Sequence, residues 1–545
     1  MKKLLAMLMI AAICLGLFAC SNESANTDST KPSQNNSANT ADPNAIAIEI
    51  GGRKVSVLEM NYFYVDSINQ WYNQYGMYAS YFGLSASVGL DQQVYDQEKG
   101  TTWADYFMDQ AIETAKSIYT VYDAAQNADY ALSDDEKASL DALYTSLEQQ
   151  ATSAKKTVDQ YLQGVYGESA TEKSYKAYFE IKILASSYYN HYSEELAASY
   201  SDADLRAFEG DTPYNYNSYT YASFYMPLDT FKMGGTKDID NKITYSDEEI
   251  QLAKEYLTHF KTQLSDGSIN TVAKLNLAIA WMEDEVEKLE SKPSVESLPV
   301  YSADNTEHSD DKKHSTATES TATLYSKVSA VMQEWLRDEA RQPGDITAIA
   351  YESGEGDSKT LAGYYIVLFQ ECTDNSFPLA NIRHILVMFE GGSYDSTTGQ
   401  TTYSAEEKNA AKTQAEKLYQ QWLDGEATED SFAAMANKHS DDGDGTTGGL
   451  YEDVYPGQMV PNFNNWCFDK NRQAGDHGIV ETEYGYHIMF YPGHSDQTYR
   501  NYMVSNDKLG KEMGTWLENL VASVTVKEIA MDLINKDLIL NNLSA

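Results

Sequence analysis

The chain has 545 residues, of which 42% are hydrophobic, and 82 acidic against 40 basic side chains give it a formal net charge of −42. This balance excludes binding to a nucleic-acid backbone as the main activity, because such binding needs a basic surface. The length allows two or three domains, each with an apolar core of its own.

The N-terminus has the layout of an export signal. Met1-Lys2-Lys3 is positively charged, residues 4–19 are apolar, and the run ends in Leu17-Phe18-Ala19-Cys20. An apolar run of this length is too short to span a bilayer comfortably. Its ending resembles the lipobox of bacterial lipoproteins, which implies removal of residues 1–19 and a diacylglycerol group on Cys20. The alternative is an ordinary secretory signal followed by a chance cysteine.

The segment that follows the signal is predicted to be a flexible tether. Residues 20–44 are rich in Ser, Asn and Thr and contain almost no apolar residue, so they cannot bury a core. Two acyl chains on Cys20 would hold the protein firmly at a membrane, which places it outside the cytoplasm, on the outer face of a bacterial cell membrane.

Residues 45–214 are predicted to form a mainly helical domain. Residues 46–57 alternate around Gly51-Gly52, which predicts a small hairpin, and Ser133 with Glu136 is a capping box for a later helix. Between them, apolar residues recur at helical spacing in two stripes: Met60, Tyr64, Ile68 and Trp71, then Trp103, Phe107, Ala111, Ala115, Ile118 and Tyr122. The chain also holds 42 tyrosines. We expect most to be half-buried, with an exposed subset suited to loose binding of unfolded chains.

An internal repeat organises the rest of the chain. Residues 244–249 (TYSDEE) match residues 402–407 (TYSAEE), and both copies open a predicted helix with a Ser-x-x-Glu capping box. Further matches join residues 334–345 to 465–476, and Gly363-Tyr364-Tyr365-Ile366 to Gly485-Tyr486-His487-Ile488. The repeat predicts two related modules, at residues 215–371 and 378–495.

The two copies differ where chemistry would be expected. The first has Tyr365 in place of His487, and Ala222-Ser223-Phe224 in place of Arg383-His384-Ile385. It also contains a predicted low-complexity insertion at about residues 291–323, rich in Ser, Thr, Asp and Lys, whose His308 and His314 do not indicate a metal site. The first copy is therefore predicted to be a degenerate, structural module.

The second copy carries a distinctive set of residues. Two histidines lie in apolar, strand-like runs, Arg383-His384-Ile385-Leu386-Val387 and Gly485-Tyr486-His487-Ile488. Between them come Gly448-Gly449, then Gly457-Gln458-Met459-Val460 and Phe463. This pattern resembles the parvulin family of peptidyl-prolyl isomerases over residues 378–495, and the hairpin-then-helices layout of residues 45–214 resembles the chaperone region of SurA/PrsA-type foldases.

The parvulin resemblance implies roles for particular residues. Met459 and Phe463 match the pair that forms the proline pocket, and their spacing puts both on one face of a helical turn. His384 and His487 match two histidines that face each other on central strands. Asp442 falls beside the substrate carbonyl, while Thr482 and Tyr484 fall on the loop before the last strand. Where the family usually reads Gly-Gly-Asp-Leu-Gly, this chain reads Gly448-Gly449-Leu450-Tyr451-Glu452.

The predicted fold class is α+β: a helical chaperone domain and two parvulin-like modules, each a small antiparallel sheet with surrounding helices, followed by a C-terminal helical segment at 496–545 that packs on the chaperone domain. The resemblance implies a lipid-anchored foldase that binds unfolded or partly folded exported polypeptides and isomerises their X-Pro bonds. That reaction needs no metal or cofactor, since its barrier comes from amide resonance. The alternatives are a non-catalytic holdase and a surface binding lipoprotein with one dedicated partner.

Overall fold

The computed structural model describes residues 42–231, 233–237, 243–264, 266–289, 292–298, 300–301, 313–354, 359–395, 400–443 and 445–536. The predicted signal, Cys20 and most of the predicted tether lie outside these residues, as does His308. The chain forms two compact units, Met1–Ser201 with Asn506–Ala545, and Asp202–Ser505. Within the described ranges, no helix combines the length and the apolar character that crossing a membrane requires.

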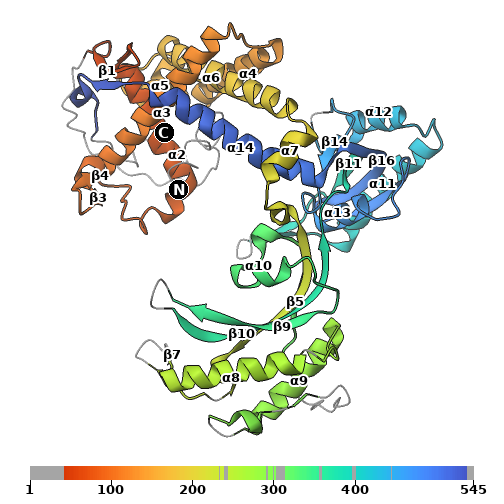
Figure 1. Ribbon diagram of the computed structural model, residues 1–545. Helices are drawn as coiled ribbons and strands as arrows, with labels where there is room; N and C mark the ends of the chain where they lie inside the picture. The colour runs from red at the N-terminus through yellow and green to blue at the C-terminus, as the bar shows by residue number, and fades with distance from the viewer. Residues whose placement is uncertain are drawn as a thin grey trace. The chain divides into compact units, whose positions relative to one another are not determined.

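The first unit is built on a small sheet and long helices (Figure 1). Its sheet has the order β17-β1-β2, so the C-terminal strand pairs with the N-terminal one. Helix α3 packs against both α2 and α6. The elements are β1 (Ile46–Ile50), β2 (Arg53–Ser56), α2 (Val57–Tyr75), α3 (Trp103–Asn127), α4 (Asp134–Ser153), α5 (Val158–Tyr166), α6 (Glu172–Ala198), the later part of α14 (Tyr499–Ala522) and β17 (Val526–Glu528).

Capping boxes define where these helices begin. Each of the five helices α2 to α6 starts after a Ser or Thr whose side chain accepts from the third helical backbone N–H, while that third residue's side chain accepts from the cap: Ser56 with Glu59, Thr102 with Asp105, Ser133 with Glu136, Thr157 with Gln160, and Thr171 with Ser174. The box at Ser56 also ends the predicted hairpin early, because Val57 becomes the first residue of α2.

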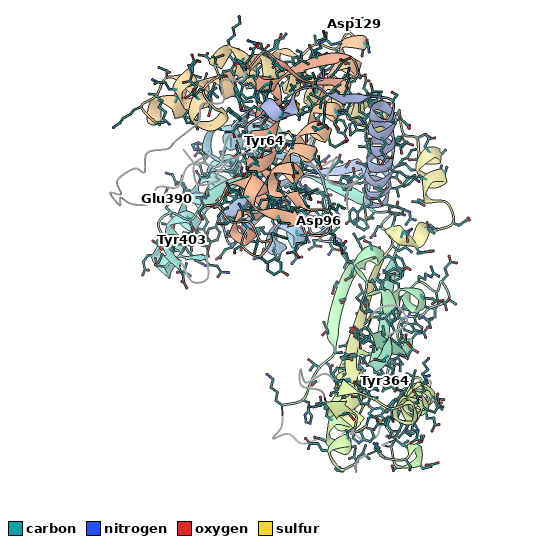
Figure 2. The ribbon with its side chains drawn as sticks, turned by 90° about the vertical axis from the view of Figure 1, so that its left-hand side faces the viewer. Tyr64, Asp96, Asp129, Tyr364, Glu390 and Tyr403 are labelled. Atoms are coloured by element: carbon teal, nitrogen blue, oxygen red, sulfur yellow. The ribbon has the colours of Figure 1, made fainter. Side chains whose placement is uncertain are left out.

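The core of this unit contains more buried tyrosine than the sequence suggested. Tyr62 is fully buried. So are Tyr64 and, in the second unit, Tyr364, both of which are labelled in Figure 2. Buried hydroxyls need partners, and Asp66 supplies one set. It accepts from the hydroxyls of Tyr166 and Tyr178 at 2.9 and 2.8 Å, and pairs with the Nζ of Lys182 at 2.6 Å.

The C-terminal segment belongs to the same core. Met513 and Leu517 on α14 are buried, and the ring of Trp516 stacks on Tyr192 of α6 with centroids 4.7 Å apart. The unit boundary lies at Ser201 rather than at the predicted residue 214.

The second unit contains two modules with the same strand order. The first sheet runs β8-β5-β10-β9 and the second β14-β11-β16-β15, so each element of one has a counterpart at the same place in the other. The first has β5 (Ser218–Pro227), α8 (Asp247–Leu264), α9 (Val272–Glu287), β8 (Thr318–Leu324), α10 (Ala330–Leu336), β9 (Ile346–Ser353) and β10 (Thr360–Thr373). The second has β11 (Pro378–Met388), α11 (Ala405–Leu423), α12 (Glu429–His439), β14 (Leu450–Val454), α13 (Pro461–Cys467), β15 (His477–Glu481) and β16 (Gly485–Thr498).

Both sheets are covered in the same way. Helices α8 and α9 pack on one face of the first sheet and α10 on the other (Figure 1). In the second sheet α11 and α12 cover one face and α13 the other. Because side chains alternate along a strand, positions 384 on β11 and 487 on β16 fall on the face that α13 covers.

A repeated corner after α10 and α13 shows how closely the copies agree. The guanidinium of Arg341 lies 4.1 Å from the ring centroid of Trp335, and that of Arg472 lies 3.8 Å from Trp466. In both copies the aspartate four residues later accepts from the backbone N–H of the glutamine after the arginine, at 2.9 Å. The glycine before that aspartate donates to the last sheet strand, to Phe369 O and Tyr491 O. The repeat seen in sequence is thus a repeat in hydrogen bonding.

The predicted low-complexity insertion is wrong at its C-terminal end. Residues 318–324 form β8, an edge strand that pairs with β5. The strand is mostly exposed on both faces, so it has no apolar alternation, and only its threonines favour a strand. His314 is also ordered, with its Nε2 2.9 Å from Oδ1 of Asp284.

Removing the cation from the Asp66 cluster should destabilise the helical unit. The side chain of Lys182 is only 8% exposed. Lys182→Met would leave Asp66 without its counter-charge, and we expect a loss of about 2 kcal/mol in the free energy of unfolding, since Asp66 is partly exposed and keeps two hydroxyl donors. Urea denaturation followed by far-UV circular dichroism measures it. Lys137→Met, which breaks an exposed pair with Asp134, is the control and should change stability by less than about 0.5 kcal/mol. Equal losses of stability in Lys182→Met and Lys137→Met would contradict a stabilising role for the buried ion pair of Lys182 with Asp66.

Candidate active site

The two predicted histidines meet between neighbouring strands. β11 and β16 pair antiparallel, with Leu386 opposite His487 and His384 opposite Met489, so the two rings sit diagonally on one face. Their Nδ1 atoms lie 3.1 Å apart, and the residues are 3% and 5% exposed. Buried polar atoms need partners, and here the Nδ1 atom of each imidazole has the other ring as its hydrogen-bond partner.

The hydrogen bonds around the pair form a consistent one-way chain. His384 Nε2 lies 3.2 Å from Oδ2 of Asp442, and a carboxylate can only accept. His384 Nδ1 then accepts from His487 Nδ1–H, which leaves His487 Nε2 to accept from the hydroxyl of Thr482 at 2.9 Å. Thr482 Oγ1 in turn accepts from the backbone N–H of Tyr484 at 3.2 Å. Every ring nitrogen is paired while both rings are neutral.

The electrostatics agree with two neutral rings. Burial lowers the pKa of His384 to about 4, against the opposing pull of the Asp442 carboxylate. Burial, together with the neighbouring His384, also lowers the pKa of His487 to about 4. At neutral pH neither ring carries charge, so the pair holds its geometry through hydrogen bonds and can act neither as a permanent cation nor as an ion pair.

Backbone contacts fix the loop that carries Asp442. Ser440 Oγ accepts from the N–H of Leu386 at 3.1 Å and from that of Asp442 at 3.2 Å. Asp441 Oδ2 accepts from Met388 N–H at 2.9 Å. Gly449 lies against the backbone of His384 on β11. Its φ is +66°, and a Cβ at this position would lie 2.1 Å from the carbonyl oxygen of His384. Only glycine allows this close pairing of β14 with β11.

Tyr451 is a site residue that the sequence did not identify. Its ring stacks on His384 with centroids 4.9 Å apart and planes 23° apart, and its hydroxyl donates to Asp442 Oδ2 at 2.7 Å. Burial, followed by the hydrogen bond to Asp442, raises the pKa of Tyr451 to about 12. The signal that could have found it was the departure from the family pattern in that loop, where Tyr451 stands.

The remaining predicted residues occupy different depths. Phe463 on α13 is 2% exposed and meets both imidazoles edge-on, at 5.4 Å from His384 and 5.3 Å from His487. Met459 is half-buried and packs in the same cluster. Tyr484 reaches the site through its backbone, while its side chain is 53% exposed. The structure therefore brings these residues together, with Phe463 as the floor beneath the rings.

The first module has positions equivalent to those of the site, but the residues there lack the imidazole side chains. Its strand register puts Ser223 where the second module has His384, and Tyr365 where it has His487. Counting from the matched tryptophans, Ser320 stands at the place of Tyr451, and Val328 and Met332 stand at the places of Met459 and Phe463. The apolar floor is kept, but the buried imidazole pair is absent from these positions.

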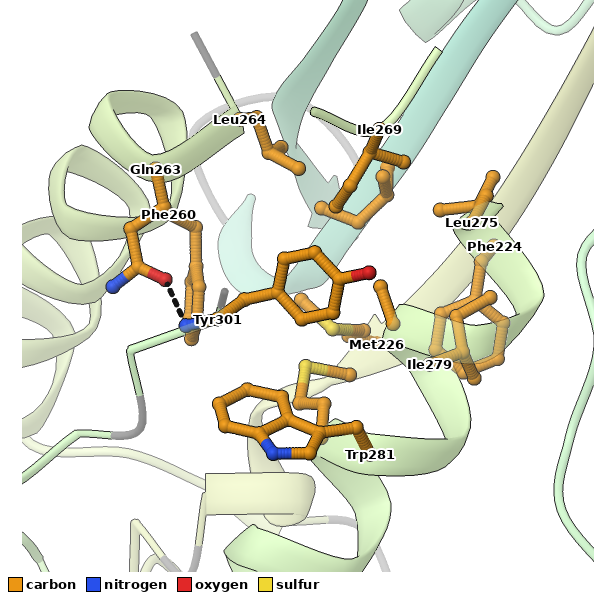
Figure 3. A pocket seen from close by; sticks show the side chains of 13 residues that line it. Phe224, Met226, Phe260, Gln263, Leu264, Ile269, Leu275, Ile279, Trp281 and Tyr301 are labelled. Carbon is orange, nitrogen blue, oxygen red and sulfur yellow. Dashed lines mark hydrogen bonds between the residues drawn. The ribbon is translucent and has the colours of Figure 1, made fainter. Parts of the chain in front are cut away.

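A separate apolar pocket lies on the opposite face of that first sheet (Figure 3). Phe224, Met226 and Ile366 line it, and these alternate along their strands with Ser223 and Tyr365. The ring of Tyr301 projects among the lining side chains, and its backbone N–H donates to Gln263 Oε1 at 2.9 Å. Because it faces α8 and α9, this pocket is not a remnant of the histidine site.

Comparison with known proteins agrees with this geometry. The family of PPIC-type PPIase domains, described as rotamases, matches residues 384–491, a span that begins at the first histidine and includes the loop of Asp442, α13 and the second histidine. Residues 384–491 form a parvulin-type peptidyl-prolyl isomerase domain. No curated protein matches the chain at a significant level.

Two solved structures are similar to part of the chain. One is the peptidylprolyl isomerase PrsA from Bacillus cereus, at 20% identity, over 27% of this chain and 49% of that one, with a TM-score of 0.16. The other is PrsA from Bacillus anthracis, at 20% identity, over 27% of this chain and 61% of that one, with a TM-score of 0.16. The matches thus span less than two thirds of those proteins, and they do not extend the assignment beyond the isomerase domain.

Removing the Tyr451 hydroxyl should change the titration of the isomerase domain. In Tyr451→Phe the ring still stacks on His384, but Asp442 Oδ2 loses the hydrogen bond from the tyrosine hydroxyl. The carboxylate charge then interacts more strongly with His384, its remaining partner at that oxygen. We expect the pKa of His384 to rise by about half a unit or more, since a carboxylate favours the imidazolium. An NMR titration of the imidazoles measures it. Tyr484→Phe, which alters an exposed hydroxyl beside the same site, is the control. No shift with Tyr451→Phe would exclude the proposed sharing of Asp442.

Proposed function

We propose that this protein is a foldase that binds unfolded exported polypeptides outside the cytoplasm and isomerises their X-Pro bonds at the site formed by His384, His487 and Phe463. The observation that carries the proposal is the neutral, fully paired imidazole chain above a buried aromatic floor. It supplies apolar surroundings and fixed polar groups without a permanent charge.

Such a site suits the chemistry of the reaction. The barrier of about 18–20 kcal/mol comes from amide resonance, which is lost as the bond twists. Water bonded to the carbonyl favours the planar form, so removal of water lowers the barrier. An apolar pocket at Met459 and Phe463 would hold the proline ring and exclude that water, and Asp442 at the rim would lie beside the carbonyl. In this mechanism the rate rises because the site binds the twisted amide more tightly than the planar one.

The other parts of the chain fit a holder for such substrates. A lipid on Cys20 would keep the protein at the membrane where exported chains emerge. The helical unit would bind those chains before they fold. Uncatalysed isomerisation takes tens to hundreds of seconds, long enough to expose an unfolded chain to aggregation.

One observation favours a second candidate, a holdase without catalysis. Phe463 is only 2% exposed, so a proline ring has little direct access to it unless Met459 and its neighbours move. The first module also shows that this fold persists here without the imidazole pair. In the holdase, binding of unfolded chains would remain and isomerisation would be absent.

Truncating the apolar floor should remove the isomerase activity. We expect Met459→Ala with Phe463→Ala, in the full chain, to lower kcat/KM for an Xaa-Pro peptide by about 100-fold or more, because the twisted amide loses its apolar contacts. A protease-coupled or NMR exchange assay measures the rate. The matched control is Val328→Ala with Met332→Ala, the same two positions in the first module. Absence of catalysis in the unmodified protein would leave the holdase.

Changing the cysteine after the signal should release the protein from the membrane. We expect Cys20→Ser to move the protein from the membrane fraction to the soluble fraction and to remove acyl-chain labelling, because two acyl chains supply the anchor. Cys372→Ser is the control and should change neither readout. A Cys20→Ser protein that stays membrane-bound and labelled would contradict the lipid attachment.

A further inference from the structure

The helical unit exposes a concentration of large apolar side chains between α2 and α3. Of the 17 large apolar residues that are exposed within the described ranges, eight lie between residues 72 and 95. Met77 is 90% exposed and Tyr81 is 86% exposed. Isolated exposed apolar residues are ordinary, but a cluster marks an interaction surface. We name this cluster the aromatic platform: Met77, Tyr78, Tyr81, Phe82, Val94 and Tyr95.

Three of the platform's rings, those of Tyr81, Phe82 and Tyr95, are linked by ring contacts through two tryptophans. Tyr81 contacts Phe82 at 5.6 Å between centroids, and Phe82 contacts Trp71 at 5.9 Å. Trp71 meets Trp103 at 5.1 Å, and Trp103 meets Tyr95 at 4.9 Å. The exposed rings at both ends of the segment therefore rest on a shared base of half-buried and buried tryptophan.

The segment is held so that these side chains face outward. Leu84 and Leu90 are 2% and 0% exposed and anchor its inner side. The amide of Gln93 accepts from the N–H of Ser85 at 2.6 Å and donates to the carbonyls of Ser85 and Val88 at 3.0 and 2.9 Å. These side-chain bonds hold residues 85–93, and Val94 and Tyr95 lie on a short strand, β3 (Val94–Asp96), that pairs with β4 (Thr101–Thr102). The exposure is thus part of the folded structure, and a preformed surface loses less entropy on binding.

The charge around the platform restricts what can bind it. Residues 72–102 carry Asp91, Asp96 (Figure 2) and Glu98 against a single cation, Lys99, on a chain of net charge −42. Anionic lipid would be repelled by this surface, whereas a basic polypeptide would be attracted and a neutral one would not be repelled. Exposed rings and a methionine also adapt to many apolar sequences, as promiscuous binding surfaces do.

The base of the platform has one unused hydrogen-bond donor. The Nε1–H of Trp103 is buried and has no hydrogen-bond partner among the described residues. Such groups are rare in folded proteins, because each lacks the bond it would make in water. A bound polypeptide carries backbone carbonyls that can accept from such a donor, whereas a pure hydrocarbon has no acceptor, which favours a polypeptide.

We propose that the aromatic platform binds apolar segments of unfolded polypeptides that are neutral or basic, and that it does so without regard to proline. The inference rests on the proposed function, since it gives the client binding a place and a charge preference. It separates client binding from the imidazole site, where proline is required.

The test uses proline-free peptides and the full chain without its signal. One fluorescent peptide combines apolar residues and serines with two lysines, and its partner carries two glutamates instead. The platform variant is Met77→Ser, Tyr78→Ser and Tyr81→Ser, all at exposed positions where substitution has little effect on stability. The control variant is Tyr394→Ser with Ile529→Ser, which removes exposed apolar residues elsewhere.

We expect the lysine peptide to bind more tightly than the glutamate peptide, and the platform variant to weaken its binding by about tenfold, while the control variant binds as the unmodified protein does. Isomerisation of a short Xaa-Pro peptide should be equal in all three proteins. If isomerisation is absent from all three while platform binding persists, the isomerase proposal fails and this one stands. Unchanged peptide binding in the platform variant, or an equal loss of binding in the control variant, would overturn the proposal. Phosphatidylglycerol vesicles are the third probe. A platform variant that loses only its binding to these vesicles would also overturn the proposal.

Discussion

The isomerase domain depends on the burial of two imidazoles in contact with each other. A buried polar ring is stable when each nitrogen has a partner, and a neutral, directed chain satisfies both rings without burying a charge. The carboxylate of Asp442 fixes the direction at one end, because it can only accept, and Thr482 closes the other. The low pKa of each histidine, about 4, is a consequence of the same burial.

Much of the surrounding fold serves this arrangement. β11 and β16 must be neighbours in the register that sets the rings diagonally, and the loop of Asp442 must be tied to the backbone of β11. Gly449 lets β14 approach His384 more closely than any side chain would allow. Phe463 then closes the space below both rings. A change in any of these would expose an imidazole nitrogen to water or leave it unpaired.

The first module separates what the fold needs from what the site needs. It keeps the sheet order, the stacked Trp335 and Arg341, and the glycine and aspartate turn that follows them. It replaces the two histidines with Ser223 and Tyr365 and remains folded. The imidazole pair is therefore not required for this architecture, which indicates that its presence in the second module serves the site.

The sequence predicted those features that rest on local rules. A capping box depends on two residues three positions apart, and the repeat is visible as a direct match between two segments. The equivalence of Ser223 with His384 followed from counting along the matched strands. The contact of Tyr451 with His384 and Asp442 depends on three segments meeting in space, and no spacing along the chain reveals it. β8 was missed because an edge strand exposed on both faces has no apolar alternation. The burial of Tyr166 and Tyr178 is supported by hydrogen bonds to Asp66, which lies about a hundred residues away from them in sequence.

Placing holding and catalysis at different sites follows from the different demands of each. Loose binding of many sequences needs exposed, adaptable rings, and the platform offers these in the helical unit. Stabilising a twisted amide needs a dry site of fixed geometry, and a buried imidazole pair offers little exposed surface for loose binding. Because one chain carries both, binding of an unfolded client at the proposed platform would raise the effective concentration of its proline residues at the isomerase domain. Weak binding at the platform would then be sufficient, since its proposed function is to keep a slow-folding segment within reach rather than to hold it tightly.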